Sequence, residues 1–230
     1  MEAGVEWQQI RAWRRQQRAA LIARRAALPA AQRRQWSDAI SACIESCFPL
    51  LAGMTVGFCW PYQGEFDARF AIRHLRERGA TAALPAVVAK AGPLQFRKWW
   101  PGAPMTPGAY DIPVPDGTEP VAPEAVIVPM NGFDEQGYRL GYGGGYFDRT
   151  LAAAAPRPVA IGVSFEFARL PTIYPQPHDI AMDFVVTEAG AYAVAASRLL
   201  RVDAAECRER AQRLFAQRRL LVIRDWCQRP

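Results

Sequence analysis

Near the middle of the chain, the segment RLGYGGGYFDR from Arg139 to Arg149 combines a flexible backbone with charged and phenolic side chains. Four of its residues are glycines, which lack a Cβ atom, so a ligand can approach the main-chain N–H groups closely. The residues that follow, YFDRTLAAAA, predict a helix whose N-terminus attracts anions. With Arg139, Tyr146 and Asp148 on the same segment, the pattern favours a phosphate site over a plain glycine-rich turn.

The glycine loop matches neither of the two common nucleotide-binding motifs. No Gly-Lys-Ser/Thr follows it, as a P-loop requires, and its glycine spacing differs from that of the dinucleotide fingerprint. A nucleotide bound here would need arginines and Mg²⁺ to neutralise its phosphates. Asp148 and Asp179 are candidate ligands, since Mg²⁺ takes a few carboxylates and keeps several waters. Each also has a structural alternative, Asp148 as an acid in the first turn of a helix and Asp179 as a turn cap.

A second candidate site follows a predicted strand, in the segment YQGEFDA. The carboxylate of Glu65 could accept paired N–H bonds from a polar heterocycle, and Trp60 and Tyr62 offer flat surfaces for stacking. The alternatives are a helix-capping glutamate and aromatic packing at a strand end, which is the more frequent fate of such aromatics. His178 has no partners in the sequence, and no Ser-His-Asp or Cys-His arrangement is indicated.

The net charge of +6 is concentrated at the two ends of the 230-residue chain. Residues 1–34 carry eight Arg against two Glu, and residues 198–230 carry nine Arg against four acidic residues. These arginines fall on predicted helices without a known nucleic-acid-binding motif. Solvated helix faces are therefore expected, with a binding role for a few arginines, and nucleic acid is not expected as a partner.

Composition also bounds the cellular context. The five cysteines are an odd number without a zinc pattern, which indicates a reduced, cytoplasmic protein. No run of about 18 uncharged apolar residues is present, so no membrane segment is expected. The N-terminal residues lack the apolar stretch of a secretory signal. A monomer is favoured.

The elements that must position these side chains alternate between short apolar strands and helices. Helices are predicted at 7–28, 30–48, 66–79 and 146–154, strands at 55–60, 80–87, 94–100, 125–130, 158–165 and 183–188, and turns or loops at 101–123 and 131–138. This order predicts an α/β fold, a three-layer α/β/α sandwich with a largely parallel central sheet, Rossmann-like without the dinucleotide fingerprint. Ligands of such sheets bind at the carboxyl ends of the strands, where the glycine loop falls.

One domain spanning 1–230 is expected. It would comprise an N-terminal helical region at 1–48, an α/β core at 49–190 and a basic C-terminal helical extension at 198–230.

Several of these segments together resemble the 5-formyltetrahydrofolate cyclo-ligase family, also called 5,10-methenyltetrahydrofolate synthetase. The segment IVPMNGFDEQGYRLGYGGGYFDRTL is similar to the family signature. The resemblance extends to the Arg-rich N-terminal helix, to YQGEFD, to PGAPMTPGAYDIPVP and to IGVSFEFARLPTIYPQPHDIAMDFVVTE, so it covers roughly residues 10 to 190.

The resemblance implies an ATP- and Mg²⁺-dependent cyclisation of 5-formyltetrahydrofolate to 5,10-methenyltetrahydrofolate, with release of ADP and phosphate. It implies catalytic roles for Arg139, Tyr146 and Asp148, and Mg²⁺ binding by Asp148 and Asp179. The implied ATP-binding residues are Arg14, Arg15, Arg18, Arg139, Leu140, Gly141, Tyr142, Gly143, Gly144, Gly145, Tyr146 and Phe147. The implied folate-binding residues are Trp60, Glu65, Tyr142, Gly143, Gly144, Gly145 and Tyr146.

Two residues depart from the family pattern. Arg14 stands where the family usually has Lys, and Phe147 replaces the second Tyr of a Tyr-Tyr-Asp run. The resemblance also says nothing about residues 198–230. Two alternatives therefore stay open at this point: a diverged paralogue that binds ATP but acts on another substrate, and a basic RNA-binding regulatory protein.

Overall fold

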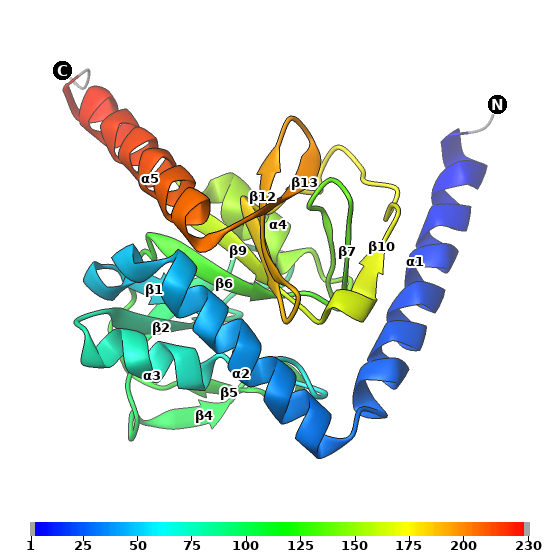
Figure 1. Ribbon diagram of the computed structural model, residues 1–230, viewed down its shortest axis with the longest axis horizontal. Helices are drawn as coiled ribbons and strands as arrows, with labels where there is room; N and C mark the ends of the chain where they lie inside the picture. The colour runs from blue at the N-terminus through cyan, green and yellow to red at the C-terminus, as the bar shows by residue number, and fades with distance from the viewer. Residues whose placement is uncertain (1–2, 228–230) are drawn as a thin grey trace.

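The computed structural model describes residues 3–227, and its central feature is an eight-stranded sheet (Figure 1). The strands of this sheet are β1 (Thr55–Gly57), β2 (Thr81–Ala86), β3 (Gln95–Trp99), β6 (Ala125–Pro129), β9 (Val159–Val163), β11 (Phe184–Thr187), β12 (Gly190–Ala195) and β13 (Arg198–Val202). Their spatial order is β13-β12-β11-β9-β6-β1-β2-β3.

Five neighbouring strands of the sheet, β2, β1, β6, β9 and β11, run parallel to one another. Strand β3 adds an antiparallel edge on one side, and the β12–β13 pair adds another. Parallel strands are covered on both faces, which is why β6 and β9 read as continuous apolar runs rather than alternating ones. The predicted largely parallel sheet is confirmed.

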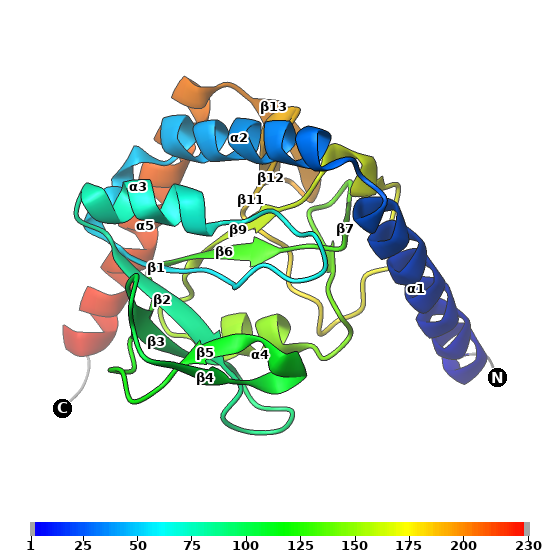
Figure 2. The same cartoon turned by 90° about the horizontal axis from the view of Figure 1, so that it is seen from below.

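Helices cover both faces of the sheet, as a three-layer sandwich requires. The α-helices are α1 (Ala3–Ala26), α2 (Ala30–Cys47), α3 (Arg69–Glu77), α4 (Tyr146–Ala153) and α5 (Ala204–Cys227). Figure 2 shows α2 and α3 on one face and α4 on the other. Ile44 of α2, Leu75 of α3 and Phe215 of α5 are buried in one core cluster, whereas Leu151 of α4 belongs to a second cluster beneath the opposite face.

Several short elements complete the described chain. The 3₁₀ turns are η1 (Pro49–Gly53), η2 (Ala109–Asp111) and η3 (Glu166–Ala168). A small sheet in the order β10-β7-β8 comprises β7 (Gly132–Asp134), β8 (Arg139–Leu140) and β10 (Arg169–Leu170). The predicted turn at 131–138 is therefore a hairpin, in which the Asp134 carboxylate accepts the N–H groups of Gln136 and Tyr138, each at 3.0 Å. This hairpin delivers Arg139 to the site.

Two further predictions were wrong in part. The predicted loop at 101–123 contains a second hairpin of β4 (Met105–Pro107) and β5 (Pro113–Pro115), whose prolines are tolerated because the pair stands outside the main sheet. The predicted C-terminal helix at 198–230 starts only at Ala204, because residues 198–202 form β13. The link between β12 and β13 is Ala196–Ser197, with φ of 48° and 57°, which gives the backbone twist of a tight hairpin turn.

Within residues 3–227, every helix is too short or too polar to cross a lipid bilayer.

The β7–β8 turn gives a test of how tightly this region is packed. Gly137 has a φ of +83°, and a Cβ atom there would overlap with the Cγ2 methyl of Val194, whereas Gly102, at φ +88°, has nothing within 4 Å of such an atom. Both alanine variants suffer left-handed strain of about 1–2 kcal/mol. We expect Gly137→Ala to lose about 1–3 kcal/mol more, because overpacking adds to the strain. Urea unfolding of the two variants checks this, and equal losses would contradict it.

Candidate functional site

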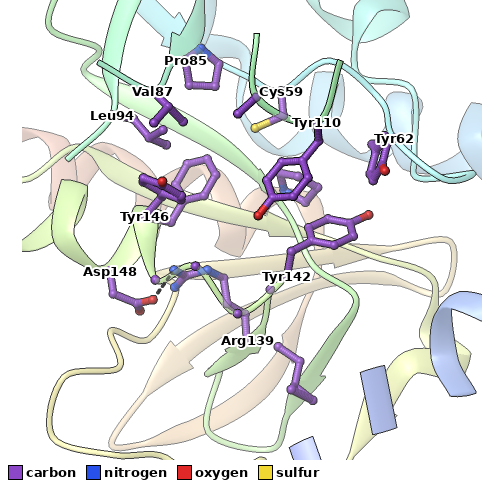
Figure 3. A pocket seen from close by; sticks show the side chains of 18 of the residues that line it. Cys59, Tyr62, Pro85, Val87, Leu94, Tyr110, Arg139, Tyr142, Tyr146 and Asp148 are labelled. Atoms are coloured by element: carbon purple, nitrogen blue, oxygen red, sulfur yellow. Dashed lines mark ion pairs between the residues drawn. The ribbon is translucent and has the colours of Figure 1, made fainter. Parts of the chain in front are cut away.

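A cavity of about 900 Å³ opens between α1 and the carboxyl ends of β1, β2 and β6 (Figure 3). Every site residue predicted from the sequence lines it: Arg14, Arg15, Arg18, Trp60, Glu65, the continuous run from Arg139 to Asp148, and Asp179. Figure 3 shows Arg139 and Asp148 at one end of the cavity and Tyr62, Tyr110 and Tyr142 around the other. The sheet topology thus brings together segments that are far apart in the sequence.

The glycine loop between β8 and α4 uses its backbone freedom at two positions. Gly143 and Gly145 have φ of +95° and +63°, in the left-handed region, and Gly145 is the residue that precedes α4. Arginines hold the loop from both sides: Arg18 Nε donates to the carbonyl of Gly141 at 2.6 Å, and Arg149 Nη2 to that of Gly144 at 2.6 Å. Positive charge therefore surrounds a loop that leads into a helix N-terminus, as anion binding requires.

At the base of the loop, Arg139 and Asp148 form an ion pair with an Nη2–Oδ2 distance of 2.9 Å. Their side chains are only 5% and 16% exposed. Burial lowers the pKa of the Arg139 guanidinium, and the adjacent Asp148 carboxylate opposes that shift. Asp148 also accepts the N–H of Ile180 at 3.0 Å and lies in the first turn of α4, which is the structural alternative that the sequence offered for this residue.

A second ion pair joins α1 to the 173–179 segment. Arg14 Nη2 lies 2.5 Å from Asp179 Oδ2, and the guanidinium also donates to the carbonyls of Ile173 and Tyr174, each at 2.9 Å. Asp179 accepts the N–H of Gln176 at 2.7 Å, which is the turn cap that the sequence suggested. Asp148 and Asp179 are thus both in the cavity wall, and both carboxylates face an arginine.

The arginines of α1 form an electropositive wall. Burial and the neighbouring charges of Arg14 and Arg15 lower the pKa of Arg18. Arg15 is exposed and lines the cavity. Arg14 and Arg18 are half-buried and line the cavity, so they depart from the expected solvated helix face, and the binding role expected for a few arginines stays a prediction.

The opposite end of the cavity is built around Glu65, which is only 8% exposed. Its Oε1 accepts the phenolic O–H of Tyr142 at 2.9 Å, and its Oε2 accepts the N–H of Tyr62 at 3.1 Å. Burial raises the pKa of Glu65, and nearby positive charge and these hydrogen bonds oppose the shift. Burial and the Glu65 charge also raise the pKa of Tyr142.

Trp60 lies between the core and the cavity. It packs against the core, with its ring 6.3 Å from that of Trp99 in an edge-on arrangement, and it also lines the cavity. The guanidinium of Arg69 lies 4.5 Å from the ring centroid, so one face of the indole is already covered.

Two functional candidates escaped the sequence reasoning. Arg25 is only 5% exposed and donates to the Tyr142 phenol oxygen at 3.1 Å. Arg25 lies seven residues after Arg18 and eleven after Arg14, so all three share one helix face. This spacing in the sequence could have identified Arg25. Tyr110, which lines the cavity and is 71% exposed, comes from the hairpin that was predicted as a loop, so no signal placed it here.

The metal-binding capacity of the site is limited. Among the described residues, no cluster of three His, Cys, Asp or Glu side chains could hold an ion unaided. Asp148 and Asp179 both act electrostatically on Arg139. Asp179 Oδ2 already accepts from Arg14 and Gln176, so the spare acceptor capacity of that carboxylate lies on Oδ1. Two carboxylates suit an ion that takes its other ligands from phosphate and water, as Mg²⁺ does.

Comparisons with known proteins agree on one family. The sequence model of the 5-formyltetrahydrofolate cyclo-ligase family matches residues 10–188. A 5-formyltetrahydrofolate cyclo-ligase of Mycolicibacterium smegmatis is 32% identical over 180 residues, which are 75% of this chain and 92% of the relative. One from Escherichia coli K12 is 31% identical over 134 residues, 56% of this chain and 74% of the relative.

Solved structures give the same result for the fold. An NMR structure of Aquifex aeolicus 5,10-methenyltetrahydrofolate synthetase superimposes with a TM-score of 0.70 at 25% identity, covering 82% of this chain and 96% of that one. A 5,10-methenyltetrahydrofolate synthetase from Mycoplasma pneumoniae gives a TM-score of 0.63 at 19% identity, covering 76% and 98%. The second likeness bears on the fold alone.

The electropositive wall predicts anion binding that can be measured without any substrate. Inorganic triphosphate should raise the melting temperature in a concentration-dependent way, because a ligand that binds only the folded state stabilises it by mass action. We expect Arg15→Ala to weaken this binding about tenfold, since one charge-assisted contact is lost. Arg34→Ala, an exposed arginine of α2 outside the cavity lining, is the control and should leave it unchanged. Identical titrations for the two variants would contradict the assignment.

Proposed function

The chain belongs to the 5-formyltetrahydrofolate cyclo-ligase family, which forms 5,10-methenyltetrahydrofolate, and we propose that it does so with ATP as co-substrate and Mg²⁺ as the metal. The observation that carries this proposal is the convergence of the implied site residues on one cavity. The arginines and the glycine loop lie at one end and suit phosphates. The buried acceptor Glu65 and its aromatic neighbours lie at the other end and suit a heterocycle.

The proposed reaction begins with phosphoryl transfer. The formyl oxygen of 5-formyltetrahydrofolate attacks the γ-phosphorus of ATP, the bond to the β,γ-bridging oxygen breaks, and ADP leaves. Phosphorylation turns the formyl oxygen, a poor leaving group, into a good one. The protein forms no covalent bond in such a transfer. It catalyses the step by aligning the two substrates and by stabilising the charge of the transition state.

Ring closure follows in the same cavity. N10 of the folate attacks the activated formyl carbon, the carbon–oxygen bond breaks, and inorganic phosphate leaves with its electron pair. N10 loses its proton, and the product is the 5,10-methenyl cation. The reacting groups of the two ligands must lie within bonding distance of each other. The glycine loop would therefore contact both ATP and the folate.

The site residues have roles in this scheme that follow from their positions in the cavity. Arg139 is buried and pairs with Asp148, so its guanidinium is held in one orientation. It would stabilise negative charge on the phosphoryl group during transfer. Tyr146 begins α4 at the end of the loop, beside the guanidinium of Arg149, and would contact both ligands there. Arg14, Arg15 and Arg18 would meet the remaining phosphates of ATP.

Asp148 and Asp179 are the residues that would hold Mg²⁺. When bound, this ion neutralises phosphate charge and orients the γ-phosphoryl group. Both carboxylates are paired with arginines. A bound nucleotide offers those arginines phosphate oxygens in exchange, which frees carboxylate lone pairs for the metal.

The activity itself is directly measurable. Purified protein with Mg²⁺, ATP and 5-formyltetrahydrofolate should generate the absorbance of 5,10-methenyltetrahydrofolate and release ADP in equal amount. Omission of ATP or chelation of Mg²⁺ should stop both. A paralogue with another substrate would instead be stabilised thermally by ATP and give no response to 5-formyltetrahydrofolate, which would refute the proposal.

The metal assignment has its own test. We expect Asp148→Asn to lower kcat about 100-fold or more, because a group that fixes transition-state charge is lost. Asp38→Asn, on the exposed side of α2, is the matched control and should retain full activity. The melting temperature of each variant establishes that it is folded, and near-normal turnover by folded Asp148→Asn would remove this carboxylate from the mechanism.

A further inference from the structure

Arg25 is a buried cation whose position the reaction chemistry described so far does not explain. Its residue is 5% exposed, on the α1 face that meets the body of the protein. Burying a guanidinium is costly unless its donors are paired. Its Nε donates to the carbonyl of Gln63 at 3.0 Å and its Nη2 to the phenol oxygen of Tyr142 at 3.1 Å. Both partners belong to loops that line the cavity.

The direction of the hydrogen bonds follows from the donors present. A guanidinium only donates, so the Tyr142 oxygen accepts from Arg25. The single phenolic proton of Tyr142 is then free for the Glu65 carboxylate, whose Oε1 lies at 2.9 Å. Arg25, Tyr142 and Glu65 therefore form one directed chain from α1, across the glycine loop, to the loop after β1.

Several groups act on the Glu65 carboxylate. Tyr62 donates its backbone N–H, Tyr142 donates its phenol, and Arg25 exerts the largest opposing influence on the rise in pKa that burial causes. Burial and the nearby Glu65 charge together raise the pKa of the Cys59 thiol. Arg33 of α2 is close to the same turn, with its Nη1 3.6 Å from the position that a Cβ on Gly64 would take.

We propose that Arg25, acting through the phenol of Tyr142, is a positioning residue that keeps Glu65 ionised and oriented for the pyrimidine ring of the folate. This inference rests on the proposed function. The folate ring carries an amide N–H next to an exocyclic amine, and a carboxylate with two acceptor oxygens can take both. A protonated carboxyl has lost part of that acceptor capacity. Tyr142 donates to one oxygen of Glu65 and leaves its further lone pairs for the ligand.

The pH dependence of folate binding follows with a definite sign. Folate affinity is present while Glu65 is ionised and is lost as the pH falls through its pKa. Burial raises that pKa, and the positive charge of Arg25 limits the rise. In Arg25→Gln the pKa of Glu65 rises further, so the midpoint of the affinity loss moves to higher pH.

The test compares four variants in the full-length protein: Arg25→Gln, Arg25→Lys, Tyr142→Phe and Arg24→Gln. We expect Arg25→Gln to raise the KM for 5-formyltetrahydrofolate about tenfold at neutral pH, with kcat and the KM for ATP near wild type. The reason is that the lost interaction binds the folate equally in the ground state and in the transition state. Arg25→Lys keeps the charge and should restore the pH midpoint. Arg24→Gln alters the neighbouring exposed arginine, whose guanidinium lies over Phe167, and should change none of these values.

Tyr142→Phe keeps the proposal testable if Arg25→Gln does not fold, because Tyr142 is 41% exposed and its replacement leaves the core intact. Removing the phenol should also move the pH midpoint upward, since its hydrogen bond favours the ionised carboxylate. Tighter folate binding by Tyr142→Phe would overturn the proposal and identify Tyr142 as a competitor for Glu65. Unchanged pH profiles in folded Arg25→Gln would overturn it as well. An inactive wild-type protein would instead refute the proposed function.

Discussion

The attachment of α1 to the rest of the molecule is the constraint on which the site depends. This helix stands at the side of the sheet (Figure 1), and among its described side chains Leu21, at 8% exposed, is the only buried apolar one. Three arginines attach the helix by hydrogen bonds: Arg14 to the 173–179 segment, Arg18 to the glycine loop and Arg25 to the loop after β1. Since these segments line the cavity, the contacts that attach α1 also shape the site.

Polar attachment has an energetic consequence. Apolar side chains at this interface would offer no hydrogen-bond donors to a phosphate. Arginines bonded to carbonyls and carboxylates can exchange those partners for phosphate oxygens. Arg14 and Arg139 each face an aspartate in the cavity wall, and both aspartates are candidate metal ligands. Under the proposed function, Mg·ATP supplies a cation for the carboxylates and anions for the guanidinium groups. The pairs thus hold the site in shape before the ligand arrives, without leaving buried charges uncompensated.

The sequence identified residues that line the cavity but not the hydrogen bonds that connect them. The glycine loop, Glu65, Asp148 and Asp179 could be found because each lies in a short motif with its own local signal. The Arg25–Tyr142–Glu65 chain could not, because it depends on how α1 docks on two loops 38 and 117 residues away. The β12–β13 hairpin was missed for a different reason. Its turn uses Ala196 and Ser197 at positive φ, where Asn-Gly would have been recognisable.

The two departures from the family pattern acquire physical reasons from these contacts. A lysine at position 14 would carry its donors on a single atom, whereas the Arg14 guanidinium spans the carbonyls of Ile173 and Tyr174 and the Asp179 carboxylate together. Arginine here therefore fixes the whole segment that presents Asp179. The ring of Phe147 lies 5.7 Å from the Arg139 guanidinium, an arrangement that favours the cation through the ring face and needs no hydroxyl. Phe147 has no phenol, and its ring keeps that support for Arg139.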